Sequence, residues 1–156
     1  MSFKTLLAAT TAALIAMPAF AGPQISIENA YARAAGAMAV AGAAFFTIRN
    51  TGDEDDRLVA AKSDAAKMVQ LHTHIAEGDV MRMVEVPEGF PVPAGGTHEL
   101  KRGGDHVMMM GLKAPFVDGE SIDLTLVFEK SGPIEISVPV DNAREDGAGM
   151  SMTMSN

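Results

Sequence analysis

Residues 121–140, SIDLTLVFEKSGPIEISVPV, alternate apolar and polar side chains on either side of a short turn. Every second residue is apolar from Ile122 to Phe128, and the pattern repeats from Ile134 to Val140. Residues two apart share one face of a strand, so each half presents one apolar face. The Gly-Pro pair between the halves favours a hairpin of two half-buried antiparallel strands.

Short segments of the same kind recur along the chain between turns rich in Gly, Pro, Asn and Asp. No long segment has a convincing helical period. Glycines weaken the Ala-rich residues 33–44 as a helix, so we read them as a loop that leads into a strand. This pattern predicts an all-β fold, a single antiparallel β-sandwich. The further strands are expected at residues 24–33, 43–50, 56–63, 68–74, 80–86, 97–102 and 106–112, with residues 87–96 as a loop.

The first 21 residues have the pattern of a secretory signal peptide. Lys4 is followed by an apolar run and then by the small-residue motif Ala19-Phe20-Ala21. We expect cleavage after Ala21, which leaves a domain at residues 22–141 and a tail at residues 142–156. No later apolar run reaches the roughly 18 residues that a membrane span needs, so we expect an exported protein without membrane insertion.

Composition narrows the possible functions. The formal net charge of −8 argues against a nucleic-acid partner. The chain has no cysteine, so disulfides, thiolate ligands and a lipid-bearing cysteine are excluded, and we expect a protein free in its compartment. No nucleophile–base arrangement or pair of acids stands out, which argues against an enzyme.

Histidine and methionine are concentrated in two short segments. Residues 71–86 read LHTHIAEGDVMRMVEV and residues 103–112 read GGDHVMMMGL. A tight turn centred between Glu77 and Gly78 would pair His74 with Met81 and His72 with Met83, with Cβ atoms about 4.5–5.5 Å apart. A second hairpin, turning at Gly103-Gly104, would place His106, Met108 and Met110 on one face of its second strand. The sequence alone does not show whether the two sets face each other.

These side chains together bind only a few kinds of metal ion. Thioether and imidazole ligands together select copper, especially Cu(I), whereas zinc prefers thiolate, imidazole or carboxylate ligands. A blue-copper centre is excluded because it needs a cysteine. Spacing favours a metal site over coincidence for the set His72, Met83, His106 and Met108.

Other residues of these types receive simpler interpretations. Met38, Met68 and Met109 are expected to fill the core, and His98 is expected at the surface or the edge of the core. Residues 53–56, DEDD, lack the spacing of a calcium loop and are expected to form a solvated turn.

The His and Met spacing resembles the H-x10-M-x21-H-x-M signature of the PCuAC-type periplasmic copper chaperones. Here the spacer between Met83 and His106 has 22 residues, and the extra residue falls in an expected loop. Asp105 stands where we expect an aromatic or aliphatic residue that would shield the site. The resemblance extends over residues 25–140.

The resemblance implies a Greek-key β-sandwich of the cupredoxin-like or immunoglobulin-like type in a periplasmic protein. It implies Cu(I) bound by His72, Met83, His106 and Met108. It also implies copper delivery to the assembly of respiratory cytochrome oxidase, at a CuA-type site or its assembly factors. We further expect a monomer whose copper acceptors are dithiols. His74, Met81 and Met110 are outside the motif, and form either auxiliary ligands or a polar rim.

The tail, residues 142–156, is expected to be disordered because it is polar and lacks apolar periodicity. Its Met150, Met152 and Met154 alternate without a core to fill, so they could hold a second copper ion, with chance composition as the alternative. Two other functions fit the sequence. One is a periplasmic copper-resistance or buffering protein, and the other is a metal-free sandwich that binds proteins.

Overall fold

The computed structural model describes residues 22–145. The predicted signal peptide and the methionines Met150, Met152 and Met154 lie outside this range. Within it, the chain forms strands, turns and bends but no helix, and therefore no helix that could cross a membrane.

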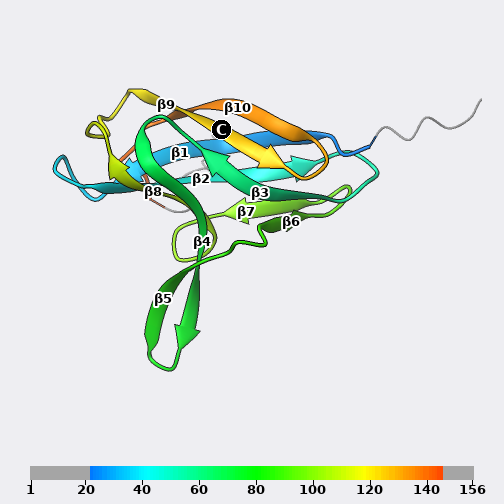
Figure 1. The fold of residues 1–156 in the computed structure, drawn as a ribbon, viewed down its shortest axis with the longest axis horizontal. Helices are drawn as coiled ribbons and strands as arrows, with labels where there is room; N and C mark the ends of the chain where they lie inside the picture. Colours follow the sequence, from blue (N-terminus) through cyan, green and yellow to red (C-terminus); the bar gives the residue numbers. More distant parts are fainter. Residues whose placement is uncertain (1–21, 146–156) are drawn as a thin grey trace, which may run out of the picture.

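Ten strands follow one another along the described residues (Figure 1). Their bounds are β1 Ile25–Ala34, β2 Ala41–Asn50, β3 Asp56–Lys62, β4 Ala66–Glu77, β5 Val80–Glu85, β6 Phe90–Val92, β7 Thr97–Leu100, β8 His106–Leu112, β9 Ser121–Phe128 and β10 Gly132–Pro139. Nine of these lie where the sequence predicts strands. The short β6 does not, because it lies within residues 87–96, which the sequence predicts as a loop.

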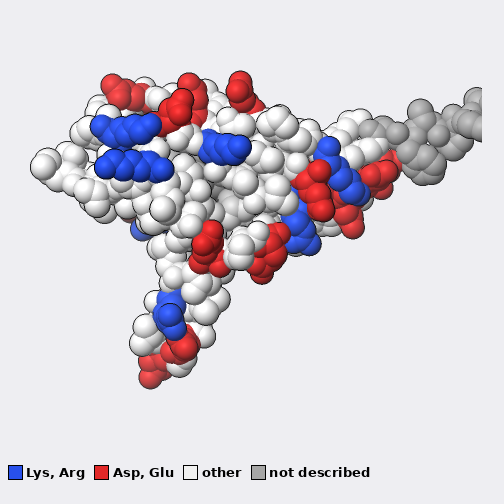
Figure 2. Space-filling model, viewed as in Figure 1, with Lys and Arg blue, Asp and Glu red and all other residues white. Residues whose placement is uncertain are grey.

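The strands form two antiparallel sheets that pack face to face. One sheet has the order β1-β2-β8-β4-β5, with β7 also paired to β2, and the other has the order β10-β9-β3-β6. Neighbouring strands are often distant in the sequence, as the crossovers of a Greek-key arrangement require. The predicted all-β antiparallel sandwich is therefore confirmed. Its β4–β5 hairpin projects beyond the body of the sandwich, as both the ribbon and the space-filling view show (Figure 1, Figure 2).

The core lies between the sheets and follows the alternation that the sequence shows. Leu124, Leu126 and Phe128 of β9 are buried against Val107 and Met109 of β8 in one apolar cluster. Met109 thus fills the core as predicted. The same prediction is wrong for Met68 and Met38, which are 52% and 93% exposed, since neither lies on a core-facing side.

The strands β7 and β8 do not form the predicted hairpin. Both pair with β2: β7 lies beside Phe46–Arg49 and β8 beside Ala41–Ala44. They therefore run in line along the same neighbour, joined by a tight turn at residues 101–105, in which the amide of Lys101 donates to the carbonyl oxygen of Asp105 at 2.9 Å. This arrangement frees the other edge of β8 to pair with β4.

The beginning of the predicted tail contacts the sandwich. The amide of Ala34 donates to the side-chain oxygen of Asn142 at 2.9 Å, and the Asn142 amide group donates to the carbonyl oxygen of Phe116 at 3.0 Å. The Arg144 guanidinium lies 4.5 Å from the centre of the Tyr31 ring. Residues up to Arg144 therefore help to cover the outer face of β1.

Candidate metal centre

The pairing of β4 with β8 brings the two His/Met segments together. His72 lies directly opposite His106, Gln70 opposite Met108, and Met68 opposite Met110. Directly opposed residues share a face of the sheet, and this face is the outer one, because the alternate residues Leu71, Val107 and Met109 lie in the core. The sequence could not show that the two segments face the same way. The structure places them on one surface.

The projecting hairpin adds Met83, with a register that differs from the predicted one. His74 lies opposite Met83, and Met81 lies opposite Ala76, so the predicted pairs His74–Met81 and His72–Met83 are wrong. The loop consists of Gly78 and Asp79, one residue further along than expected, and Gly78 has a φ of 66°, which glycine adopts without strain. The pairing therefore shifts by two residues, and every side chain keeps its predicted face.

Three imidazoles gather where β4 meets β8. The centre of the His106 ring lies 5.9 Å from that of His72 and 5.2 Å from that of His74. Nδ1 of His106 and Nδ1 of His74 both face the carbonyl oxygen of Gly104, at 2.9 Å and 3.3 Å. A carbonyl oxygen only accepts hydrogen bonds, so Nδ1 carries a proton in both rings. In neutral His106 the lone pair is then on Nε2.

The His72 ring is held by its own strand. Its Nε2 lies 3.1 Å from the side-chain oxygen of Gln70, which assigns the proton to Nε2 and the lone pair to Nδ1. Two imidazole nitrogens, Nδ1 of His72 and Nε2 of His106, are buried without a hydrogen-bond partner. They are the only such side-chain nitrogen or oxygen atoms in the described part of the chain. Buried polar atoms are normally partnered, so this pair points to a missing ligand.

Burial favours the neutral form of these two imidazoles. Burial lowers the pKa of His72 below the usual 6.5, and this effect and the proximity of His74 outweigh the opposing effect of Glu85. Burial also lowers the pKa of His106, although its hydrogen bond to Gly104 and the nearby Asp105 act in the opposite direction. A neutral imidazole is the form that binds a metal ion.

Two thioethers lie beside the imidazoles. A pocket of about 440 Å³ is lined by His74, Met83, His106 and Met108 among others, whereas His72 is not one of its lining residues. His106 is only 2% exposed, Met108 is half-buried and Met83 is 44% exposed. No group of three His, Asp or Glu side chains in residues 22–145 is arranged to hold a metal ion. A metal ion at this site would therefore need thioether ligands as well as imidazoles.

Aromatic rings and a fourth histidine, His98, support the site, and the sequence interpretation did not identify them in this role. The Phe45 ring lies 6.1 Å from His106 and 5.1 Å from Tyr31. Nε2 of His98 lies 2.8 Å from the carboxylate of Asp105, and its ring stacks on Phe90. His98 is thus at the edge of the core as predicted, and it holds the turn that carries Gly104. Alternation in β2 could have identified Phe45, because its neighbour Phe46 faces the core.

The auxiliary residues lie at different places on the same face. His74 lines the pocket. Met81 is 58% exposed, opposite Ala76 and closer to the hairpin tip. Met110 lies at the opposite end of the site, paired with Met68.

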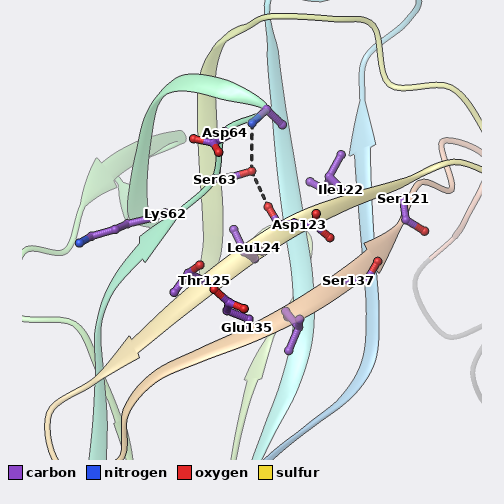
Figure 3. A pocket seen from close by; sticks show the side chains of 12 residues that line it. Lys62, Ser63, Asp64, Ser121, Ile122, Asp123, Leu124, Thr125, Glu135 and Ser137 are labelled. Atoms are coloured by element: carbon purple, nitrogen blue, oxygen red, sulfur yellow. Dashed lines mark hydrogen bonds between the residues drawn. The ribbon is translucent and has the colours of Figure 1, made fainter.

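A second hollow, of about 750 Å³, lies on the other sheet. Its lining includes Lys62, Ser63, Asp123 and Glu135 (Figure 3). The Ser63 hydroxyl donates to the carbonyl oxygen of Asp123 at 2.6 Å and accepts from the amide of Ala65 at 3.2 Å. Neither of the two unpartnered buried nitrogens of the described chain lies here. The hollow therefore offers less sign of a ligand than the His/Met face.

The chain is similar to known proteins over most of its length. Residues 25–140 match a protein family described as LpqE-like, putative lipoprotein LpqE-like. The chain is 39% identical over 116 residues to a protein named putative lipoprotein Lxx21020 of Leifsonia xyli subsp. xyli, an alignment that covers 74% of this chain and 69% of that protein.

Solved structures of the same fold contain copper-binding domains. The copper-bound PCuAC domain from PmoF2 superposes with a TM-score of 0.62 at 25% identity, covering 76% of this chain and 92% of that domain. The Cu(I) form of DR1885 from Deinococcus radiodurans superposes with a TM-score of 0.59 at 33% identity, covering 76% of this chain and 80% of that one. Since the family match spans most of the chain and these domains share its fold, the chain belongs to the LpqE-like family and carries a domain of the PCuAC type.

Proposed function

We propose that this protein is a periplasmic copper chaperone without enzymatic activity, which binds Cu(I) through His72, Met83, His106 and Met108. The observation that carries this proposal is the pair of buried, unpartnered imidazole nitrogens, Nδ1 of His72 and Nε2 of His106. Both imidazoles have lowered pKa values, so both offer a lone pair at neutral pH. A bound cation would remove the cost of leaving these nitrogens buried and unpaired.

The donor set favours Cu(I) over other ions. The two thioethers are soft, and all four ligands are neutral. The thioethers favour Cu(I) over Zn²⁺, which prefers thiolate, imidazole or carboxylate ligands, and over Mg²⁺, which prefers oxygen. Similarity to the copper-bound PmoF2 domain and the Cu(I) form of DR1885 supports the same conclusion.

The exposure of the ligands supports delivery rather than storage. His106 is buried, whereas Met83 is 44% exposed on the projecting β4–β5 hairpin. A partner could therefore reach the ion from the Met83 side while the imidazoles still hold it. We propose that the recipient is a dithiol acceptor in cytochrome oxidase assembly, at a CuA-type site or its assembly factors, because thiolates bind Cu(I) more strongly than thioethers. A copper-resistance or buffering protein remains the second candidate.

The proposal is tested by titrating the protein with Cu(I) against a competing chelator. Met83→Leu and Met108→Leu keep the side-chain volume, so the fold should survive. Each variant should lose at least about tenfold in affinity, equivalent to about 1.4 kcal/mol. Met81→Leu is the matched control, because Met81 lies on the same strand and face but opposite Ala76.

Three results are informative. Loss of affinity in the two test variants with an unchanged control supports the ligand assignment. Equal affinity in all variants would show that the thioethers do not bind the ion. A parent protein that takes up no Cu(I) would favour the metal-free, protein-binding alternative.

A further inference from the structure

A second pair of thioethers lies on the same outer face as the candidate metal centre. Met68 on β4 and Met110 on β8 are direct cross-strand partners. Met68 is 52% exposed and Met110 is half-buried. Their neighbours Val69 and Met109, which also form a cross-strand pair, face the core instead. Core packing therefore does not explain the methionines at 68 and 110.

The geometry allows both sulfur atoms to reach one ion. Directly opposed residues have Cβ atoms about 4.5–5.5 Å apart, and methionine has a long, flexible side chain. On the far side of β8, Met110 lies opposite Ala41, which is too small to cover it. The two thioethers are thus adjacent, accessible and on one face.

Met68 and Met110, here called the outer pair, are the last of three cross-strand pairs along β4 and β8 that carry metal-binding or polar side chains. Along β4 and β8 the cross-strand pairs are His72–His106, then Gln70–Met108, then Met68–Met110. Successive pairs are two residues apart, or about 6.6–6.8 Å along the strand. Met108, a proposed ligand of the main site, lies between the imidazoles and the outer pair.

We infer that Met68 and Met110 form a second, weaker site for a soft monovalent metal ion, Cu(I) or Ag(I). Two neutral thioethers select soft ions, and with only two protein ligands they hold an ion less tightly than the four proposed at the main site. The short step to Met108 makes this pair a place where an incoming ion is captured before it reaches the imidazoles. This inference goes beyond the proposed function. Its order of binding and its role in capture rest on the proposed main site, whereas ion binding by Met68 and Met110 themselves does not.

The test is a titration of the full chain, labelled with ¹³C at the methionine methyl groups, with Ag(I), which does not oxidise. The methyl resonances of Met68 and Met110 should shift together, after the first equivalent of Ag(I) has bound. In Met68→Leu the Met110 methyl should no longer shift, and in Met110→Leu the Met68 methyl should no longer shift. The buried Met109 methyl reports in each variant that the core is intact.

Two controls separate a shared site from adventitious binding to single thioethers. Met81→Leu removes an equally exposed methionine that faces Ala76, so the shifts of Met68 and Met110 should be unchanged. Met83→Leu weakens the main site and should leave the response of the outer pair in place. If neither methyl shifts, or if one still shifts after its partner is replaced, the pair is not a site.

Discussion

His72 and His106 lie directly opposite each other on β4 and β8, with ring centres 5.9 Å apart and planes inclined at 67°. Each ring uses one nitrogen in a hydrogen bond, to Gln70 and to the backbone of Gly104, and keeps the other buried and unpartnered. The fold therefore holds both rings in defined tautomers and positions. Such preorganisation lowers the free-energy cost of binding, because little has to be ordered when the ion arrives.

Replacement of His72 should weaken Cu(I) binding more than replacement of His74. His72→Ala removes a buried nitrogen that lacks a partner, and we expect a loss of at least about tenfold in affinity, or about 1.4 kcal/mol. His74→Ala should have a smaller effect, because no nitrogen of His74 is both buried and unpartnered. Competition against a Cu(I) chelator measures both variants. A larger loss of Cu(I) affinity for His74→Ala would show that His74, which lines the pocket, is the ligand in place of His72.

The pH dependence of Cu(I) affinity should follow the imidazoles alone, because thioethers do not titrate. The pKa values of His72 and His106 lie below the usual 6.5, so both rings are neutral above that pH and no proton competes with copper. Affinity should stay constant from neutral pH down to about 6.5 and fall once the pH passes through the lowered pKa values. Chelator competition, corrected for protonation of the chelator, measures the change.

The number of protons that compete distinguishes one imidazole ligand from two. In the parent protein up to two protons should compete with each copper ion, one for each ring. In His72→Ala at most one proton should compete, so affinity should fall less steeply with pH. An affinity of the parent protein that does not change with pH, even in strongly acidic solution where the protein is still folded, would exclude both histidines as ligands.

The sequence predicted the strand faces of the proposed ligands correctly, but it predicted the register of their hairpin wrongly. Alternation along a strand gave the correct faces for His72, Met83, His106 and Met108, because an error of two residues in register leaves every side chain on its face. The error itself arose because the turn begins at Gly78 rather than Glu77. Alternation in the sequence therefore indicates which face of a strand a side chain occupies. It leaves the register undetermined in steps of two residues.

The long-range pairing could not be predicted. His72 meets His106 because β7 and β8 lie in line along β2, which leaves β8 free to pair with β4. No alternation of polar and apolar residues specifies which strand lies beside which. The roles of Gly104 and of the His98–Asp105 pair were missed for the same reason, since they depend on a turn whose place in the sheet only the fold defines.

The prediction that residues 53–56 form a solvated turn is wrong for Asp56. It was made because a run of four acidic residues is usually exposed to solvent. Asp53, Glu54 and Asp55 are exposed as expected, whereas Asp56 is 4% exposed. Its carboxylate accepts hydrogen bonds from the amides of Arg57, Lys130 and Ser131 and from the Ser131 hydroxyl, at 2.6–3.0 Å. Asp56 thus ties the start of β3 to the turn between β9 and β10. The acidic run therefore contains one buried residue, Asp56, that has a structural role.

We expect Asp56→Ala to lower the free energy of unfolding by roughly 1–3 kcal/mol, because the variant leaves buried donors without an acceptor. Burial alone would raise the pKa of Asp56, but the hydrogen bonds from Ser131, Lys130 and Arg57 outweigh it and lower the pKa below its usual 3.8. The stabilisation by the charged carboxylate is therefore complete above about pH 4. It is lost as the pH falls further, through the lowered pKa.

Urea denaturation of the parent and of Asp56→Ala between neutral and acidic pH measures this contribution. The difference in stability between the two proteins should be constant above about pH 4 and shrink below it. Asp56→Asn keeps one acceptor oxygen without the charge, so its stability should fall between those of the other two proteins. A stability difference that is independent of pH down to strong acid would show that the ionised form of Asp56 is not what stabilises the fold.

Delivery and storage of copper predict different transfer kinetics. The most exposed of the four proposed ligands is Met83, at 44%, while His106 is 2% exposed, so a dithiol acceptor should displace Met83 first and the imidazoles last. The thiolates of the acceptor then replace neutral ligands one at a time, and the ion never has to pass through solvent. The net charge of −8 would steer a basic acceptor toward the protein, an effect that salt screens.

We therefore expect the rate of Cu(I) transfer to rise with acceptor concentration and to exceed the rate of spontaneous release. Stopped-flow mixing of the loaded protein with increasing concentrations of a dithiol acceptor measures both rates, with a non-thiol Cu(I) chelator as the reference for release. A transfer rate that stays at the release rate for every acceptor concentration would favour a passive buffer. A deletion strain with normal oxidase activity under copper limitation would also count against delivery, because an assembly factor is needed most when its metal is scarce.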